Sequence, residues 1–358
     1  MKQWKKTICC LFMFSAFSAC LAAEEDSTST KGYFIYPVFF YTPETQWAYG
    51  AAMTIFSRKP ESTRPSSWIP MVVYTQKTQI IAKVTADLYG KDEKWNTYAE
   101  FGYYDYPDLF YGIGNQTTID QKESYTAKRL LIQVSPRYRI RSDLYVGLQY
   151  KFMHQSLSEL EEEGLLIQGQ IPGSQKSQYS GIGGLVSWDT RDNIYFPIKG
   201  HYRQLYLSWY GSALGSDYTY RSMTVDLRQY IPVLSKHVLA MQAYSQMNFG
   251  TVPFQALPSY GNSQRMRGYY GGRFRDNHFL VLQTEYRFFF SRMIGATVFG
   301  GFGDVSHYLK DFQIKNFNYS VGFGFRFCIN PKEKLHVRLD FGYGENTSGY
   351  YVEVIEAF

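Results

Sequence analysis

Charged and apolar residues alternate with a period of two along the second half of the chain. Between Phe279 and Phe290, charges fall on one set of alternate positions and apolar or aromatic residues fill the other set. The stretches 319–327 and 335–343 repeat this pattern. A period of two is that of an extended strand, whose successive side chains point to opposite faces. Segments of about ten residues with one charged face are typical of a transmembrane β-barrel, which has lipid outside and a polar lumen inside.

Pairing such stretches along the chain predicts an all-β fold of sixteen antiparallel strands, an even number as in bacterial single-chain barrels. The predicted strands are 33–41, 46–58, 67–76, 79–90, 94–104, 125–139, 144–156, 178–189, 199–210, 217–231, 236–249, 277–290, 293–303, 317–329, 333–345 and 349–358. Links after even-numbered strands are mostly short, whereas links after odd-numbered strands include the long segments 106–124, 157–176, 250–276 and 304–316. Because periplasmic turns are the short ones in such barrels, we expect both chain ends in the periplasm.

The composition supports this interpretation. The mean hydropathy of −0.32 is typical of a soluble protein, yet 18% of the residues are aromatic, with 33 Tyr and 27 Phe. A barrel reconciles these values because only one face of each strand meets lipid, and aromatic girdles line both membrane interfaces. A tyrosine-rich soluble β-sandwich is the alternative, and the predicted export signal and strand length argue against it.

The first residues have the features of a secretory signal peptide, for which we predict residues 1–23. A basic start is followed by the apolar stretch 7–18, then by small residues and by the acidic run 24–26. Cys20 ends a segment that is similar to a lipobox, so lipidation of Cys20 is the alternative to cleavage after Ala22 or Ala23. The prediction for the mature chain is a short periplasmic segment, 24–32, followed by a barrel over 33–358.

Charge and cysteine content exclude several function classes. The formal charge of +6 falls to +3 when Lys2, Lys5 and Lys6 leave with the signal, and the remaining basic residues are scattered. We therefore expect no nucleic-acid partner. Cys328 is the one cysteine expected in the mature chain. No Ser/His/Asp set or carboxylate pair has catalytic spacing, so we expect no enzyme activity, no cofactor and no metal.

The longest predicted extracellular loop, the sixth, contains the segment 264–274. Within it, Met266, Arg267, Gly268 and Tyr269 resemble the [V/I/M]-R-G-[F/Y] motif of the Omp85 superfamily, which includes the BamA and TamA assembly factors and the two-partner-secretion transporters. The resemblance implies a sixteen-stranded barrel whose sixth loop folds into the lumen, where the arginine contacts acidic residues of the wall. A guanidinium in a partly desolvated lumen needs such a partner.

Other segments resemble the same family. Asp189, Arg191 and Asp192, followed by Pro197 and Gly200, are similar to its D-x-R-D…P…G turn between the eighth and ninth strands. The resemblance extends over roughly 33–358. The family's thirteenth strand usually carries an Asp that receives the loop arginine, but Gly301 stands there. The expected partners of Arg267 are the carboxylates of Glu285, Asp304 and Asp340, of which Glu285 and Asp340 point inward by parity.

Two features concern the junction of the first and last strands. Pro37 lacks a backbone N–H and should weaken the ladder at this seam, and the last strand, ending in Phe358, carries Glu356 where an apolar residue is expected. We expect a seam that opens laterally or distorts the bilayer. The alternative is that Pro37 is purely structural.

The resemblance also bears on function. Only nine residues lie between the predicted signal and the first strand, too few for the periplasmic POTRA domains of the family. The sequence therefore predicts a POTRA-less outer-membrane barrel of a Gram-negative bacterium that assists insertion or translocation of proteins or lipid. Expected partners are outer-membrane lipid or lipopolysaccharide, an unfolded outer-membrane protein or lipid as substrate, and a periplasmic or outer-membrane helper protein. The alternative is a passive pore plugged by its sixth loop.

Overall fold

The computed structural model describes residues 30–42, 46–58, 64–331 and 334–358. The predicted signal peptide, including Cys20, lies outside these residues, as does the predicted segment 24–32 apart from its last three residues. Within the described part of the chain, no helix is long and apolar enough to cross a bilayer.

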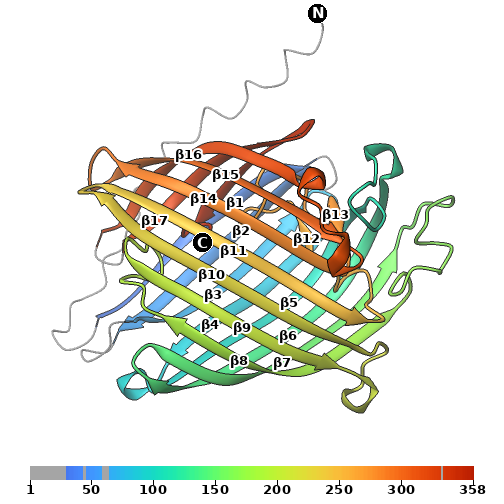
Figure 1. The fold of residues 1–358 in the computed structure, drawn as a ribbon, viewed down its shortest axis with the longest axis horizontal. Helices are drawn as coiled ribbons and strands as arrows, with labels where there is room; N and C mark the ends of the chain where they lie inside the picture. Colours follow the sequence, from blue (N-terminus) through green and yellow to red (C-terminus); the bar gives the residue numbers. More distant parts are fainter. Residues whose placement is uncertain (1–29, 43–45, 59–63, 332–333) are drawn as a thin grey trace, which may run out of the picture.

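The wall is one antiparallel sheet of sixteen strands, each paired with its neighbours along the chain. The strands are β1 (Thr30–Thr42), β2 (Gln46–Arg58), β3 (Ser66–Thr75), β4 (Ile80–Tyr89), β5 (Trp95–Phe110), β6 (Glu123–Arg141), β7 (Leu144–Ser158), β8 (Ser177–Asp189), β9 (Gly200–Tyr210), β10 (Tyr220–Leu234), β11 (His237–Gly250), β14 (His278–Phe289), β15 (Ile294–Ser306), β16 (Asn318–Asn330), β17 (Leu335–Gly344) and β18 (Thr347–Val354). Figure 1 shows these strands slanting around a barrel. The predicted all-β, sixteen-stranded architecture is thus confirmed.

Short elements occupy the links. The 3-10 helices are η1 (Lys91–Glu93), η2 (Ile119–Gln121), η3 (Ser212–Leu214), η4 (Leu309–Asp311) and η5 (Ile314–Asn316). Two further strands, β12 (Ser259–Tyr260) and β13 (Phe274–Arg275), pair with each other inside the link 251–277 between β11 and β14, which we call loop 6. Loop 6 begins at the end of the barrel that carries the long links, here called the long-loop end. The opposite end is the short-turn end.

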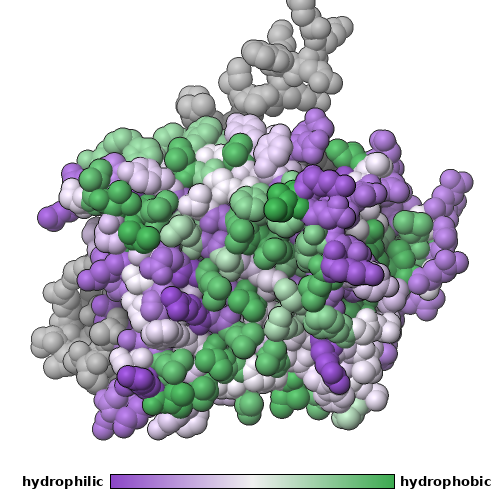
Figure 2. All heavy atoms as spheres, viewed as in Figure 1, coloured by the Kyte–Doolittle hydropathy of each residue, from purple (hydrophilic) through white to green (hydrophobic). Residues whose placement is uncertain are grey.

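The inward and outward faces follow the predicted alternation. On β14, Glu285 and Arg287 are fully buried, whereas Leu282 is 37% exposed on the outer face. On β17, Arg338 and Asp340 are buried and Tyr343 is exposed. Figure 2 shows apolar side chains across the visible outer wall and hydrophilic residues concentrated toward the loops. The alternation therefore separates a lipid-facing surface from a lumen that carries charge.

The fifth and sixth strands are longer than predicted. β5 runs to Phe110 and β6 begins at Glu123, and these two residues are register partners at the long-loop end. The prediction ended the fifth strand at residue 104 and began the sixth strand at residue 125. Pro107 interrupts the sequence pattern, yet it stays in the ladder opposite Thr126. Pairing with a neighbouring strand holds this segment extended where local sequence does not.

The end of the chain departs most from the prediction. The last strand stops at Val354, and Ile355 has a positive φ of 79° that turns the chain away from the wall. Ala357 and Phe358 are then buried in the lumen against Tyr230 and Ala240. The expectation that Phe358 lies at the seam is therefore wrong. We call residues 355–358 the C-terminal tail.

Candidate functional site

Loop 6 folds back into the lumen from the long-loop end. Its short hairpin, β12 with β13, brings the predicted motif against the inner faces of β14, β15 and β17. Met266 and Tyr269 of the motif are buried in a cluster with Phe279, Val281 and Val305 of the wall. Apolar packing of this kind holds the loop inside the lumen and places Arg267 beside the wall.

Arg267 is 2% exposed and reaches two carboxylates on different strands. Its Nη1 donates to Asp340 Oδ2 at 2.5 Å, and its Nη2 forms a salt bridge with Glu285. The guanidinium carbon lies 3.5 Å from the centre of the Phe299 ring. The planar fork of an arginine can engage β14 and β17 at once, which a lysine ammonium could not do with the same geometry.

The two carboxylates belong to a larger buried network. Glu285 also forms a salt bridge with Arg287 at 2.7 Å. Asp340 also forms salt bridges with Arg326 and Arg338, each at 2.6 Å. Four arginines from loop 6, β14, β16 and β17 thus share two wall carboxylates. Buried arginines need such charged partners because desolvation of an unpaired cation is costly.

The C-terminal tail supplies the third carboxylate of this network. Glu356 pairs with Arg326 at 2.9 Å and lies 3.7 Å from Arg287. Arg287 also donates to the Phe358 carbonyl oxygen at 2.9 Å, and Arg338 donates to the Ile355 carbonyl oxygen at 3.0 Å. The polar Glu356, unexpected for an outward strand position, is therefore an inward ion-pair partner.

Gly268 allows the loop backbone to touch the wall backbone. Its φ is +111°, and a Cβ there would lie 2.7 Å from the Tyr343 backbone nitrogen. A Cβ on Gly342 of β17 would likewise lie 2.6 Å from the carbonyl carbon of Arg267. Only two facing glycines permit this approach without displacing main-chain atoms.

Hydrogen bonds on both sides of Gly268 fasten the motif to the last strands. The Tyr269 hydroxyl donates to the Tyr319 carbonyl oxygen and accepts the Glu345 backbone N–H, both at 3.0 Å. The Gly268 N–H donates to the Tyr351 hydroxyl at 2.9 Å. Burial raises the pKa of Tyr269, so its hydroxyl stays protonated and can donate.

Asp304 is not a partner of Arg267, which corrects one of the three expected contacts. Its carboxylate instead accepts hydrogen bonds, at 3.1 Å, from the side-chain amide of Asn115 in the link between β5 and β6. At Gly301, where an acidic residue was expected by resemblance, a Cβ would lie 2.8 Å from the Gln283 Cβ. Gln283 instead donates to the Gln264 carbonyl oxygen of loop 6 at 2.8 Å.

The predicted turn motif shapes the link 190–199 at the short-turn end. Asp189 accepts two bonds from the Arg191 guanidinium at 2.8 and 2.9 Å, and Asp192 accepts backbone N–H groups of 198 and 199. Pro197 is buried, and Gly200 has a φ of +101° with no room for a Cβ beside the Thr190 carbonyl.

This turn also packs into the mouth of the barrel. Phe196 is 4% exposed and lies 5.0 Å, between ring centres, from Phe289 and 4.5 Å from His336. Together with the C-terminal tail, it fills the short-turn end of the lumen beneath the arginine network. The lumen is thus occupied from both ends.

Replacing Arg191 by alanine should lower the free energy of unfolding by about 2 kcal/mol, because a nearly buried Asp189 would lose its fork of hydrogen bonds and keep only Arg64 nearby. Urea unfolding in phospholipid vesicles, followed by tryptophan fluorescence, measures this. Lys199→Ala in the same turn removes an exposed side chain and should change stability by less than about 0.5 kcal/mol. Equal effects of the two variants would contradict the assigned role of Arg191.

The seam residue Pro37 lies in the β1 ladder opposite Ala51 of β2. β1 pairs with β2, and β18 pairs with β17. In residues 30–42 and 347–354 as described, no strand pairing joins β1 to β18. The carboxylate of Glu353 on β18 nevertheless has an electrostatic effect on the phenol of Tyr36 on β1, which places these two end strands near each other.

Sequence reasoning did not identify the arginines at 287, 326 and 338 or Tyr351 as parts of the site. Parity did place the three arginines on inward positions, but each looked like any other lumen residue. His, Cys, Asp and Glu side chains form no group of three suited to a metal ion in the described residues.

Comparison with known proteins agrees with this architecture. Residues 82–343 match the Omp85 superfamily domain. BamA from Haemophilus ducreyi lacking POTRA domains 1–3 is similar in structure, with a TM-score of 0.58 and 15% identity over 93% of this chain and 69% of that one. CdiB from Escherichia coli has a TM-score of 0.59 and 10% identity over 93% of this chain and 63% of that one.

CdiB from Acinetobacter baumannii has a TM-score of 0.55 and 10% identity over 92% of this chain and 60% of that one. The chain therefore spans less than two thirds of the length of either CdiB. No curated protein matches the sequence. Because the superfamily domain covers most of the barrel and the buried Arg267 motif lies within it, the chain belongs to the Omp85 superfamily as an outer-membrane β-barrel.

Proposed function

We propose that this barrel assists the insertion or translocation of proteins, or of lipid, at the outer membrane. The observation that carries the proposal is the seating of Arg267 on Glu285 and Asp340, which ties loop 6 to the last strands of an Omp85 barrel. The proposed substrate is an unfolded outer-membrane protein or a lipid. Surrounding lipid or lipopolysaccharide and a helper protein that delivers the substrate are the proposed partners. No catalytic role is part of the proposal.

The seam between β1 and β18 is where the substrate would act. β1 has 13 residues and β18 has eight, so part of β1 has no opposite residue in β18. An unpaired strand edge exposes N–H and C=O groups that can pair with an incoming strand. Arg267, Gly268 and Tyr269 hold β16 to β18 from inside, which would keep the seam in register while the substrate arrives.

A passive pore is the second candidate, favoured by one observation. Loop 6 and the C-terminal tail fill a polar lumen, as a plug would. A pore requires that the plug leave, and the many hydrogen bonds of the motif oppose that. Conductance of the Arg267 variant, described in the Discussion, separates the two functions.

Locking the seam should abolish function while the barrel stays folded. In a Cys328→Ser background, the pair Tyr36→Cys and Glu353→Cys joins β1 to β18 on oxidation. Assembly of outer-membrane proteins, measured as folded protein per cell in a deletion strain, should then stop and recover after reduction. The physical reason is that a covalent link removes the free strand edge.

A control pair of cysteines tests whether a cross-link at any place in the wall abolishes function. Leu227 of β10 and Ala243 of β11 are register partners far along the wall from the seam, so cysteines there lock a ladder that is already closed. This control should keep its activity in the oxidised state. Activity in the oxidised seam variant, with cross-linking verified on a gel, would refute the lateral-opening mechanism.

A further inference from the structure

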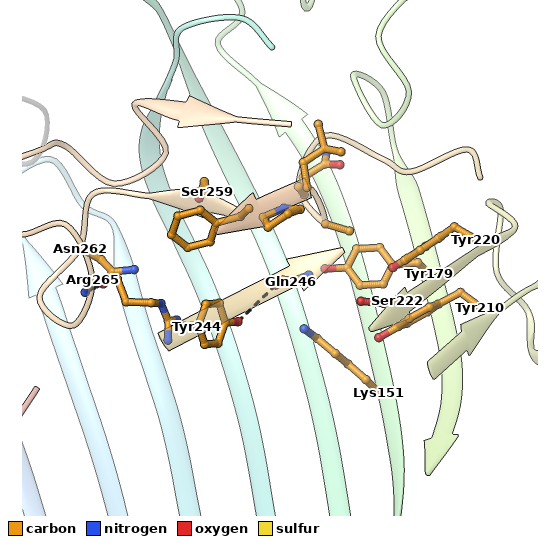
Figure 3. A pocket seen from close by; sticks show the side chains of 15 residues that line it. Lys151, Tyr179, Tyr210, Tyr220, Ser222, Tyr244, Gln246, Ser259, Asn262 and Arg265 are labelled. Atoms are coloured by element: carbon orange, nitrogen blue, oxygen red, sulfur yellow. Dashed lines mark hydrogen bonds between the residues drawn. The ribbon is translucent and has the colours of Figure 1, made fainter. Parts of the chain in front are cut away.

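The lumen contains a cavity of about 240 Å³ beneath the long-loop end. It lies between the inner faces of β7 to β11 and the part of loop 6 that precedes the motif. Lys151 of β7, a group of tyrosines at 179, 210 and 220, and Arg265 of loop 6 line it. Figure 3 shows the Lys151 ammonium pointing into this space, between Tyr244 on one side and Ser222 and Tyr210 on the other.

The cavity carries two cations and no carboxylate in its lining. Among the residues that the structure describes, neither Lys151 nor Arg265 makes a salt bridge. The Arg265 guanidinium lies 3.9 Å from the centre of the Tyr244 ring, and its Nε is buried without a hydrogen-bond partner. Both cations therefore have donors available toward the cavity.

The two carboxylates that act electrostatically on these cations are already engaged elsewhere. Glu100 acts electrostatically on Lys151 but accepts the Tyr98 hydroxyl at 2.7 Å. Asp226 acts on Arg265 but pairs with Arg228 at 2.6 Å and accepts the Gln242 amide at 2.8 Å. Two partly desolvated cations without close counter-ions are unfavourable unless an anion joins them.

We propose that this cavity binds a phosphate group, either free inorganic phosphate or the phosphate of a sugar headgroup. A doubly charged phosphate matches two cations, and its oxygens can accept from Lys151, from the Arg265 guanidinium and from the surrounding hydroxyls. The small volume excludes a folded peptide. The tyrosine rings offer faces against which a sugar can pack while their hydroxyls make hydrogen bonds.

A bound phosphate would also act on loop 6. Lys151 belongs to the wall, whereas Arg265 stands two residues before Arg267. An anion between them would add a bridge from β7 to the segment that already anchors on β14 and β17. Phosphate binding should therefore stabilise the inward position of the loop, and this inference stands apart from the proposed assembly function.

Isothermal titration calorimetry on the full mature barrel in a neutral detergent tests the proposal. The probes are inorganic phosphate, N-acetylglucosamine 1-phosphate and, as a neutral control, N-acetylglucosamine. We expect one phosphate per barrel, and about tenfold or more weaker binding in Lys151→Gln and in Arg265→Gln, because each removes a charge-assisted hydrogen bond. Lys151→Arg should retain most of the affinity, and Lys310→Gln, an exposed lysine in the link 307–317, should bind like the wild type.

The outcomes distinguish the two sources. Tighter binding of the sugar phosphate than of inorganic phosphate supports a headgroup, and the reverse order supports free phosphate. Absence of binding by both probes, or equal weakening by Lys310→Gln, overturns the proposal. The mobility of unboiled samples on a denaturing gel verifies that each variant is folded. If either Lys151→Gln or Arg265→Gln fails to fold, the other variant still tests the proposal. Binding needs no assembly activity, so this inference and the proposed function fail separately.

Discussion

Replacing Arg267 by alanine should detach loop 6 from the barrel wall and lower the free energy of unfolding by about 3 kcal/mol, because a fully buried ion pair loses one partner. The loss stays at the lower end of the usual range for such pairs. Glu285 keeps Arg287, and Asp340 keeps two other arginines, so neither carboxylate is left without a cation. Urea unfolding in vesicles measures the stability.

The same variant separates the two candidate functions through single-channel conductance in planar bilayers. The wild-type barrel should conduct little because loop 6 and the C-terminal tail fill the lumen. Arg267→Ala should conduct more and lose assembly activity together. A large steady conductance in the wild type would favour the pore.

Two further substitutions serve as controls for Arg267. Arg267→Lys keeps the charge but cannot reach Glu285 and Asp340 with one planar fork, so its stability should fall between wild type and alanine. Arg292→Ala removes an exposed arginine in the turn between β14 and β15 and should behave as the wild type. An Arg267→Ala barrel as stable as Arg292→Ala would show that the network does not hold the loop.

Replacing Gly268 or Gly342 by alanine should displace the loop motif from the wall almost as effectively as replacing Arg267 by alanine. Gly268 has a φ of +111°, and the new Cβ in either variant would lie under 3.0 Å from main-chain atoms of the opposing segment. Main-chain atoms on a paired strand cannot move aside as a flexible side chain can. We expect each alanine variant to lose at least about 2 kcal/mol of unfolding free energy.

Gly184 of β8 provides the matched control for a strand glycine. A Cβ built there meets nothing within 4 Å, so Gly184→Ala should leave stability within about 0.5 kcal/mol of the wild type or raise it slightly. The double variant at 268 and 342 should lose less than the two single losses added together, because both act on one contact. If the losses in unfolding free energy of the two single variants simply added up in the double variant, the two glycines would not act on one common backbone contact.

Much of the barrel was predictable because strand periodicity is a local property. Alternation on 279–290 and 335–343 located two wall strands and assigned their faces without any tertiary information. The same parity placed Glu285 and Asp340 inside, where the structure brings them to Arg267. It did not apply to Asp304, because the predicted strand ended at 303 and alternation assigns no face in a link, whereas β15 in the structure runs to Ser306.

The sequence by itself determined the strand count, the inward and outward faces and the position of the loop motif, since these depend on spacing within a segment. Only the tertiary structure decided which inward residues meet. The register of β16 with β17 places Arg326 opposite Arg338, close enough to Asp340 for both arginines to pair with it, and the positive φ of Ile355 carries Glu356 inward to join them. Such meetings depend on the register between strands and on the folding of loop 6 and the C-terminal tail into the lumen, and no local pattern in the sequence records either of them.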